Sequence, residues 1–173
     1  ARARIGAQGP AEALADLDVA LDILRTEGRR YYECVLHCER IPLLPPDEGL
    51  ALAASLQTLA ETHGLVALVA PVWQVHCETA LRCGETSAAQ ALARRLEERL
   101  RQRQPAALYL PLGWWTVGRA HAAAGDNTAA QMAWQAGRDW ILAHSDETRL
   151  PAAFRASFLL GNTVNREVLA AAG

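Results

Sequence analysis

Cysteine and histidine are the residues of this chain whose spacing comes nearest to a reactive or metal-binding site. One group contains Cys34, His37 and Cys38, and a second starts at His76 and Cys77. Cys34 and Cys38 would lie one helical turn apart and could share a metal ion with His37. However, this spacing on one helix lacks the short knuckle of structural zinc sites, and unpaired cysteine is common in protein cores. We therefore interpret both groups as structural and predict no metal site.

The chain also lacks the residue patterns on which common enzyme mechanisms depend. It contains no H-E-x-x-H, no G-x-S-x-G and no dinucleotide-binding glycine pattern. All 17 basic residues are arginine, and without lysine there can be no phosphate-loop lysine, Schiff base or lysine general base. We therefore predict a protein without catalytic activity and without a cofactor.

A stripe of arginines could in principle contact nucleic acid. Arg95, Arg99 and Arg103 recur at every fourth residue, and Arg94 and Arg101 join them. Two glutamates interrupt the stripe, and no aromatic side chains interleave with it for base stacking. The net charge of −2 gives no general attraction to nucleic acid or to an anionic membrane. We interpret the stripe as a solvated outer face and predict neither nucleic acid nor membrane as a partner.

Cysteine usage and hydropathy indicate the compartment. The longest apolar run, Leu65–Trp73, is far shorter than the ~20 residues of a membrane span. No signal peptide is visible, and four cysteines in 173 residues do not make a secreted disulfide scaffold. We predict a reducing, cytoplasmic setting. Because the chain begins at Ala1 without a methionine, we also expect it to be a fragment of a longer protein.

The elements that must position any site come from an internal repeat. The stretch Val72–Leu92 aligns with Gly113–Ala133 without a gap. The alignment pairs Trp73 with Trp114, Gly84 with Gly125, and Ala88-Ala89-Gln90 with Ala129-Ala130-Gln131. The offset is roughly 40 residues, a period typical of a repeated helical hairpin.

Each copy predicts two helices joined by a glycine turn. Gly125 suits the left-handed residue that ends a helix, because glycine lacks a Cβ. Thr128 and Gln131 then fit a capping box at the start of the second helix. The earlier copy keeps this pattern as Ser87 and Gln90.

At these residues the chain resembles the tetratricopeptide repeat. The second copy is large at position 114, aliphatic at 117, small at 118, bulky at 121, small at 130, aromatic at 134 and small at 137. In the first copy the match is partial, since Ala93 replaces the large residue. The resemblance implies an all-α fold, a right-handed α-solenoid of antiparallel helix pairs with about nine helices. In it, Trp134 would fill the space that the small residues leave. A generic helical bundle is the alternative.

The same interpretation makes the chain a single helical-repeat domain, with repeats in residues 1–149 and a C-terminal cap in residues 150–173. Ala1–Ile5 is predicted to end a helix, and Ala11–Thr26 to form the next one. In the tail, Phe154 and Phe158 lie on one predicted helix, and Val164 begins the apolar pattern of a last one. A terminal repeat needs its exposed apolar face covered, and we assign this role to the tail.

The tail carries a second resemblance. Its residues Leu150-Pro151, Phe154–Leu159, Asn162 and Asn165-Arg166-Glu167 are similar to the close of helical-repeat regions in large bacterial signalling proteins. Those proteins carry an NTPase module, with a transcription-activator or nucleotide-cyclase domain nearer the N-terminus. The likeness covers roughly the last third of the chain. It implies that this chain is the C-terminal part of a bacterial transcriptional regulator. None of the catalytic modules of those proteins is present in this sequence.

The resemblance also implies where a ligand would bind. In tetratricopeptide-like hairpins, the first-helix residues that lie off the packing face line the concave surface. Matching position by position gives a groove of Gln74, Glu78, Arg82, Trp115 and Arg119. Trp115 lies about 100° round the helix from Trp114, and an exposed tryptophan beside Arg119 suits an interface anchor. Alternatively, Trp115 packs against the next hairpin. The pair Tyr31-Tyr32 is open to the same two interpretations.

These observations favour a non-catalytic domain that binds a protein or peptide on its concave side, with a small-molecule inducer as another ligand class. Binding would regulate a coupled ATPase or DNA-binding module of the parent protein. The alternative is a homo-oligomerisation scaffold of a signalling ATPase or nucleotide cyclase.

Overall fold

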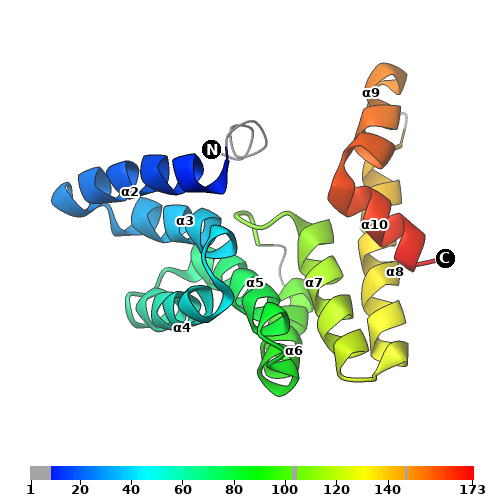
Figure 1. The fold of residues 1–173 in the computed structure, drawn as a ribbon. Helices are drawn as coiled ribbons and strands as arrows, with labels where there is room; N and C mark the ends of the chain where they lie inside the picture. Colours follow the sequence, from blue (N-terminus) through cyan, green and yellow to red (C-terminus); the bar gives the residue numbers. More distant parts are fainter. Residues whose placement is uncertain (1–8, 103–104, 147) are drawn as a thin grey trace.

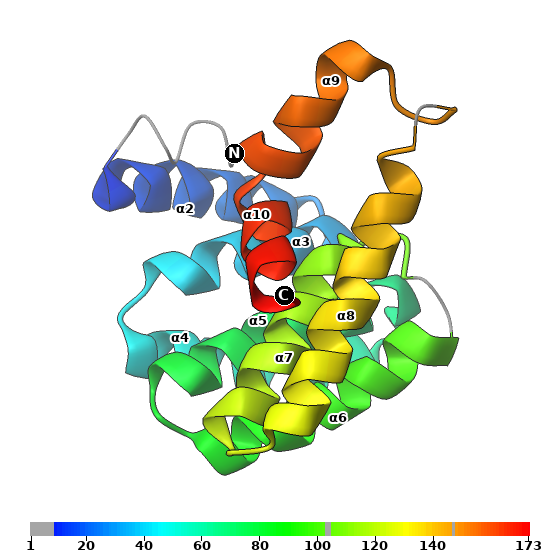
Figure 2. The ribbon, with the colours of Figure 1, turned by 90° about the vertical axis from the view of Figure 1, so that its right-hand side faces the viewer.

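The computed structural model describes residues 9–102, 105–146 and 148–173, and these ranges contain nine α-helices and no strand. The α-helices are α2 (Pro10–Thr26), α3 (Arg30–Arg40), α4 (Pro46–Thr62), α5 (Val66–Arg82), α6 (Thr86–Gln102), α7 (Leu110–Ala123), α8 (Asn127–His144), α9 (Ala152–Ala156) and α10 (Thr163–Ala171). Each helix from α2 to α8 packs against the next, and α10 returns to pack on α7 and α8 (Figure 1 and Figure 2). The prediction of an all-α fold is confirmed.

The sequence repeat appears in the helix boundaries. The first helices of the two copies, α5 and α7, end at Arg82 and Ala123, which have the same separation along the chain as Trp73 and Trp114. The second helices, α6 and α8, begin at Thr86 and Asn127, again at this separation. The sequence repeat is therefore also a repeat of helical structure.

Each copy turns from its first to its second helix at a glycine in the left-handed region. The backbone φ is 75° at Gly84 and 80° at Gly125, where any other L-residue would be penalised by its Cβ. The predicted role of Gly125 is confirmed. In both turns the residue after the glycine donates its backbone N–H to a carbonyl five residues earlier, 2.9 Å from Glu85 to Ala80 and 2.9 Å from Asp126 to His121.

The predicted capping boxes are wrong. We expected Thr128 and Ser87 to cap the second helices, but α8 begins at Asn127 and its N-cap is Asp126. The carboxylate of Asp126 accepts a 3.0 Å hydrogen bond from the backbone N–H of Ala129. Thr128 and Ser87 therefore lie inside the first turns of α8 and α6. Aspartate is as good an N-cap as threonine, and here it directly follows the glycine turn.

The two paired tryptophans occupy related positions. Trp73, on α5, donates from its indole nitrogen to Glu61 of α4 at 3.1 Å, and the guanidinium of Arg95 of α6 lies 4.3 Å from its ring centroid. Trp114, on α7, packs with leucines of α6 and against Gly137 of α8. Each tryptophan thus joins the preceding helix to the following one. They differ in burial, since Trp73 is half-buried and Trp114 is only 7% exposed.

Small residues let α7 and α8 approach closely in the second copy. A Cβ at Gly118 would lie under 3.0 Å from Nε1 of Trp134, and a Cβ at Gly137 would lie 3.2 Å from Cβ of Trp114. Trp134 therefore fills the space above Gly118, as the sequence predicts. A side chain at Gly118 would displace the Trp134 indole, and one at Gly137 would press on Val168 and on the Cβ of Trp114.

Prolines replace the glycine turn between α3 and α4. The helix α3 passes into a 3₁₀ turn, Ile41–Leu43, and Pro46 is the first residue of α4. Asp47 and Glu48 lie in the first turn of α4, where the helix dipole favours carboxylates. The segment between α3 and α4 is therefore a 3₁₀ turn followed by a proline start to α4.

The N-terminal helix α2 buries Ala13, Leu17 and Leu21. Its opposite side leaves Val19 and Ile23 63% and 54% exposed. The predicted helix end at residues 1–5 lies outside the described residues. No helix in the described part of the chain is long and apolar enough to cross a membrane.

The two parts of the tail behave differently. The last helix, α10, packs on α7 and α8 and fully buries Asn165 and Val168. Val168 lies against Gly137 of α8. By contrast, α9 and the π-helical turn that follows it project from the body (Figure 2) and leave Phe154 and Leu160 62% and 63% exposed. Among the tail helices, α10 provides the cover on α7 and α8.

Candidate binding site

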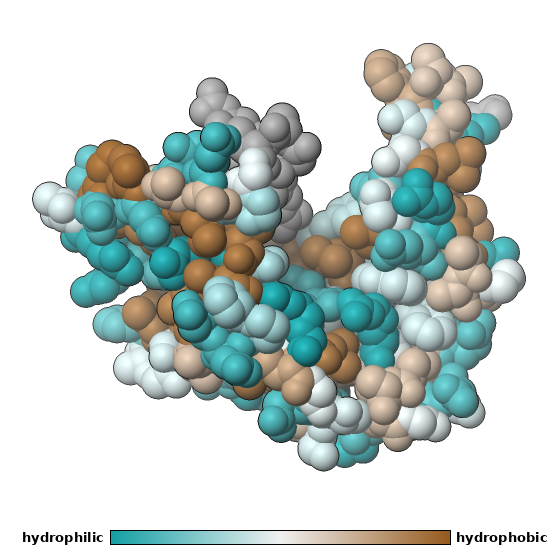
Figure 3. Space-filling model, in the orientation of Figure 1, coloured by the Kyte–Doolittle hydropathy of each residue, from teal (hydrophilic) through white to brown (hydrophobic). Residues whose placement is uncertain are grey.

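The five side chains predicted to line a groove come together on one side of the molecule. They extend from α5 and α7 and line a hollow of about 440 Å³, here called the inner hollow: Gln74, Glu78, Arg82, Trp115 and Arg119. Figure 3 shows this side hollowed between the α2–α3 end and the α9–α10 end, with hydrophilic and hydrophobic side chains mixed along it. Their convergence follows from the repeat, because equivalent faces of α5 and α7 point the same way. Their role in binding stays a prediction.

Two further segments complete the wall of the inner hollow. One is the end of α3 with the 3₁₀ turn after it, and the other is α10, which contributes Val164 and Glu167. The sequence alone does not place either segment there, because no repeat relates them to α5 and α7. The apolar spacing of α10 predicted only that Val164 belongs to a packed helix.

A hydrogen-bonded network joins α5 to α7 along the hollow. The hydroxyl of Thr116 donates to the carboxylate of Glu78 at 2.7 Å and accepts from the amide nitrogen of Gln74 at 3.1 Å. The guanidinium of Arg119 donates to the second carboxylate oxygen of Glu78. Thr116 is fully buried, and no sequence signal indicated it, since Val75 stands at the equivalent position of the first copy. The network orients the predicted side chains relative to one another.

Arg82 is held at the edge of the hollow by backbone carbonyls. Its guanidinium donates to the carbonyl of Pro42 at 3.2 Å and to that of Leu44 at 3.0 Å. These contacts tie α5 to the proline segment after α3. Carbonyl oxygens carry no net charge, so they do not neutralise the guanidinium. Together with Glu39 and Glu167, Arg82 makes the lining a mixture of both charge signs.

Trp115 is half-buried, which lies between the two interpretations of the sequence, an exposed anchor and a residue packed against the next hairpin. Its ring centroid lies 5.8 Å from that of Trp134 on α8, at an interplanar angle of 35°. It therefore packs against the second helix of its own copy. It also lines the inner hollow, so part of the indole remains available there.

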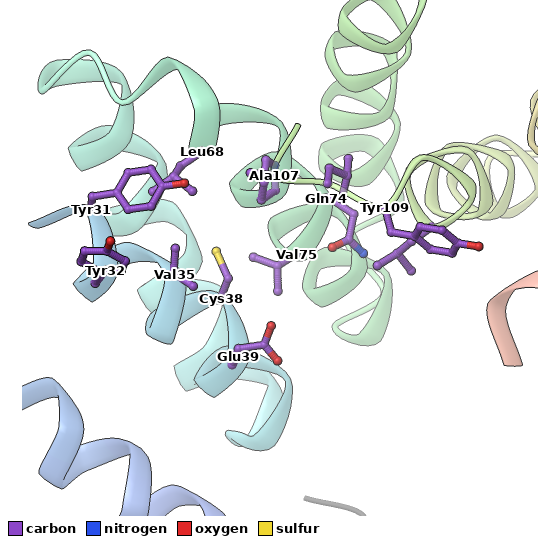
Figure 4. A pocket seen from close by; sticks show the side chains of 13 residues that line it. Tyr31, Tyr32, Val35, Cys38, Glu39, Leu68, Gln74, Val75, Ala107 and Tyr109 are labelled. Carbon is purple, nitrogen blue, oxygen red and sulfur yellow. The ribbon is translucent and has the colours of Figure 1, made fainter. Parts of the chain in front are cut away.

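A second hollow of about 360 Å³ opens beside the first. The two hollows share lining residues from α3, α5 and α7, which are Cys38, Glu39, Gln74, Val75 and Leu112. We call the second one the tyrosine pocket, because Tyr31 and Tyr32 stand on its α3 side (Figure 4). Their rings are edge-to-face with centroids 5.4 Å apart, and they are 41% and 54% exposed. Tyr109 stands on the other side with its ring turned away, and its hydroxyl donates to Asn165 at 2.7 Å (Figure 4).

The cysteine and histidine groups serve packing in this structure. Cys34 and His37 are buried on α3, and burial raises the pKa of the Cys34 thiol and lowers that of the His37 imidazole. The thiol of Cys77 donates to the carbonyl of Ala89 at 3.3 Å, and burial raises its pKa to about 12. Within the described ranges, no three His, Cys, Asp or Glu side chains are arranged to hold a metal ion.

Two arginines of the stripe form ion pairs with acidic neighbours on α6 and α4. Arg95 forms a 2.8 Å ion pair with Glu61, and Arg101 forms a 2.7 Å ion pair with Glu97. Arg103 lies outside the described residues. The paired charges of this face fit its interpretation as a solvated surface.

No protein-family model matches the sequence, and neither a curated protein nor a solved structure matches it at a significant level. The interpretation of the site therefore depends on the helix repeat and on the side chains of the two hollows.

Proposed function

We propose that this chain is a non-catalytic helical-repeat domain that binds a protein segment or peptide in the inner hollow. A small-molecule inducer is a second ligand class for the same site. The observation that carries the proposal is that five side chains from two repeat copies converge on one hollow of about 440 Å³. This volume is in the range of ligand sites, roughly 300–1,000 Å³. An indole and two guanidinium groups there offer the side chains that are enriched at binding hot spots.

In this proposal the helix pairs are antiparallel and stack as a right-handed α-solenoid like that of tetratricopeptide repeats. The constant spacing of the helix boundaries and the related positions of Trp73 and Trp114 support it. The resemblance of the tail favours the C-terminal part of a bacterial transcriptional regulator, in which binding would shift a coupled ATPase or DNA-binding module. The four cysteines have no disulfide partners, which supports a reducing cytoplasm.

Selection from a library of short random peptides tests this function. Peptides retained by the unaltered protein would be labelled, and their affinity measured by fluorescence anisotropy for the Trp115→Ala and Arg119→Ala variants. We expect each variant to lose affinity at least about tenfold, which corresponds to ~1.4 kcal/mol. Arg94→Ala is the matched control, because Arg94 is exposed on α6 away from the hollow. Full affinity in Trp115→Ala and Arg119→Ala would remove the assignment of the inner hollow.

A homo-oligomerisation scaffold is the second candidate, and exposed apolar side chains at both ends of the chain favour it. They are Val19 and Ile23 on α2, and Phe154 and Leu160 in the projecting part of the tail. Sedimentation velocity at micromolar concentration distinguishes the candidates. A scaffold would sediment as an oligomer that Ile23→Asp or Phe154→Asp disrupts, whereas a strict monomer would reject this function.

A further inference from the structure

The tyrosine pocket differs in chemistry from the inner hollow that it adjoins. Its floor is apolar, because Leu68 and Val75 of α5 belong to the hydrophobic core and are 2% and 4% exposed. On the α3 side stand Tyr31 and Tyr32, which are large side chains with a polar tip. Figure 4 shows Ala107 at the edge of the pocket, between Leu68 and Gln74. The pocket is therefore suited to an apolar group, and the hollow beside it to polar ones.

Gln74 lies between the two hollows and lines both. Its amide orientation is fixed by the network, because the single proton of the Thr116 hydroxyl goes to Glu78 and leaves that oxygen to accept from the Gln74 nitrogen. One amide N–H and the amide oxygen of Gln74 then have no partner in the described part of the chain. One donor and one acceptor side by side match the C=O and N–H groups of a peptide backbone.

Pro71 is a further lining residue of the tyrosine pocket. It lies inside α5. Proline has no N–H, so the carbonyl of Ala67, one turn earlier, loses its usual helical donor. Ala67 is exposed. Ala67 does not line the tyrosine pocket, so the polar contacts available to a ligand there come from Gln74.

We propose that the tyrosine pocket receives one large apolar or aromatic side chain of an extended peptide, whose backbone pairs with the Gln74 amide and whose remaining length lies in the inner hollow. The inference rests on the proposed function and specifies its ligand. A volume of about 360 Å³ is near the lower end of small-molecule sites, which begin at roughly 300 Å³. A cavity of this size is suited to one large side chain. The edge-to-face tyrosine pair can contact such a ring in the same geometry.

The proposal is tested by a substitution at the edge of the tyrosine pocket whose new side chain would fill it. Ala107 is an exposed loop residue that lines the pocket, whereas its neighbour Ala106 is also exposed and does not line it. In Ala107→Phe the new ring occupies the pocket, and Ala106→Phe is the matched control. Tyr32→Ala, at a half-exposed position, removes one wall without filling the pocket. Circular dichroism verifies that each variant keeps its helices before the affinity of library-selected peptides is measured.

We expect the unaltered protein to select peptides that share an aromatic or large aliphatic residue at one position. Their affinity should fall at least about tenfold in Ala107→Phe, equivalent to ~1.4 kcal/mol, and stay unchanged in Ala106→Phe. Replacing the shared residue of the peptide by alanine should weaken its binding to the unaltered protein by a similar factor, and to Ala107→Phe much less.

Two results would overturn the inference, and they separate it from the proposed function. Selected peptides that lack such a residue, or that bind Ala107→Phe normally but lose affinity in Arg119→Ala, would reject the tyrosine pocket and leave the inner hollow as the site. If the unaltered protein retains no peptide at all, both the pocket and peptide binding in the inner hollow are rejected.

Discussion

Glu78 and Arg119 stand at the same position of the two repeat copies, and their side chains form a salt bridge with each other. Both positions line the inner hollow, and this pair meets across it although Gln74 contacts Thr116 and not its own counterpart Trp115. Like charges at both positions would repel. Because the two copies carry opposite charges at this position, the salt bridge links α5 directly to α7.

Reversing this pair tests the link. Glu78→Arg should lower the free energy of unfolding because two guanidinium groups would then face each other, and the double variant Glu78→Arg/Arg119→Glu should recover part of the loss. The recovered part should be modest, within about 1 kcal/mol, since the Arg119 side chain is 42% exposed and solvent screens such pairs; the hydrogen bond from Thr116 to Glu78 is lost in both variants. Urea denaturation followed by circular dichroism measures it. A double variant no more stable than Glu78→Arg would contradict the proposed coupling.

Gly118 should be the position where α7 and α8 tolerate a methyl group least. In Gly118→Ala the new Cβ would lie under 3.0 Å from Nε1 of Trp134, so the indole must move. Overpacking of this kind costs roughly 1–3 kcal/mol, and the thermal midpoint should fall accordingly. Gly9→Ala serves as the control, because nothing lies within 4 Å of a Cβ there. Equal midpoints for the two variants would show that Trp134 does not pack on Gly118 as described.

Stability should decrease on mild acidification because of two histidines. Burial lowers the pKa of both His37 and His76. Unfolded histidine titrates near pH 6.5, so between about pH 7.5 and pH 5.5 the unfolded chain takes up protons that the folded chain resists. The pKa of the Glu61 carboxylate is lowered, chiefly by the hydrogen bond from Trp73. Glu61 therefore changes the stability only at more acidic pH, below its unfolded pKa of 4.5.

Urea denaturation across this pH range measures the effect of the histidines. The His37→Gln/His76→Gln variant should show a smaller loss of stability than the unaltered protein on going from the higher pH to the lower. An unchanged pH dependence in the double variant would assign the loss to other groups.

The four cysteines should divide into two reactivity classes. Cys34 and Cys77 are 1% and 0% exposed, and burial raises the pKa of each thiol, to about 12 for Cys77, which leaves little of the reactive thiolate. Cys38 and Cys83 are half-buried and should be alkylated in the folded protein, as mass spectrometry would show. A selected peptide should protect Cys38, which lines both hollows, and leave Cys83 reactive. Labelling of Cys77 at the rate of Cys83 would argue against the packing of α5 on α6.

Local signals explain what the sequence predicts correctly. The turn at Gly125 follows from a conformation that only glycine adopts easily, and the shared face of Gln74 and Trp115 follows from a repeat that fixes the rotation of both helices. The cap at Asp126 was misassigned because Thr128 stands two residues later and is nearly as good an N-cap. Which of the two residues is the N-cap depends on the residue at which the backbone becomes helical after the turn, and here that residue is Asn127.

The rest of the site depends on contacts between distant segments. Thr116 is a small polar residue on a helix with no special spacing, and only the packing of α7 on α5 brings it to Glu78 and Gln74. The tyrosine pocket likewise needs α3 to lie beside α5 and the loop before α7. No pattern along the chain encodes these distances.

Val164 and Glu167 place the last helix in the wall of the inner hollow. Anything that occupied this hollow would touch α10 as well as α5 and α7, so occupancy and the docking of α10 would share one coupling free energy. Such coupling is reciprocal. An occupant would stabilise the docked position of α10, and docked α10 would raise the affinity for the occupant by the same factor. Displacement of α10 from α7 and α8 would then weaken binding in the inner hollow.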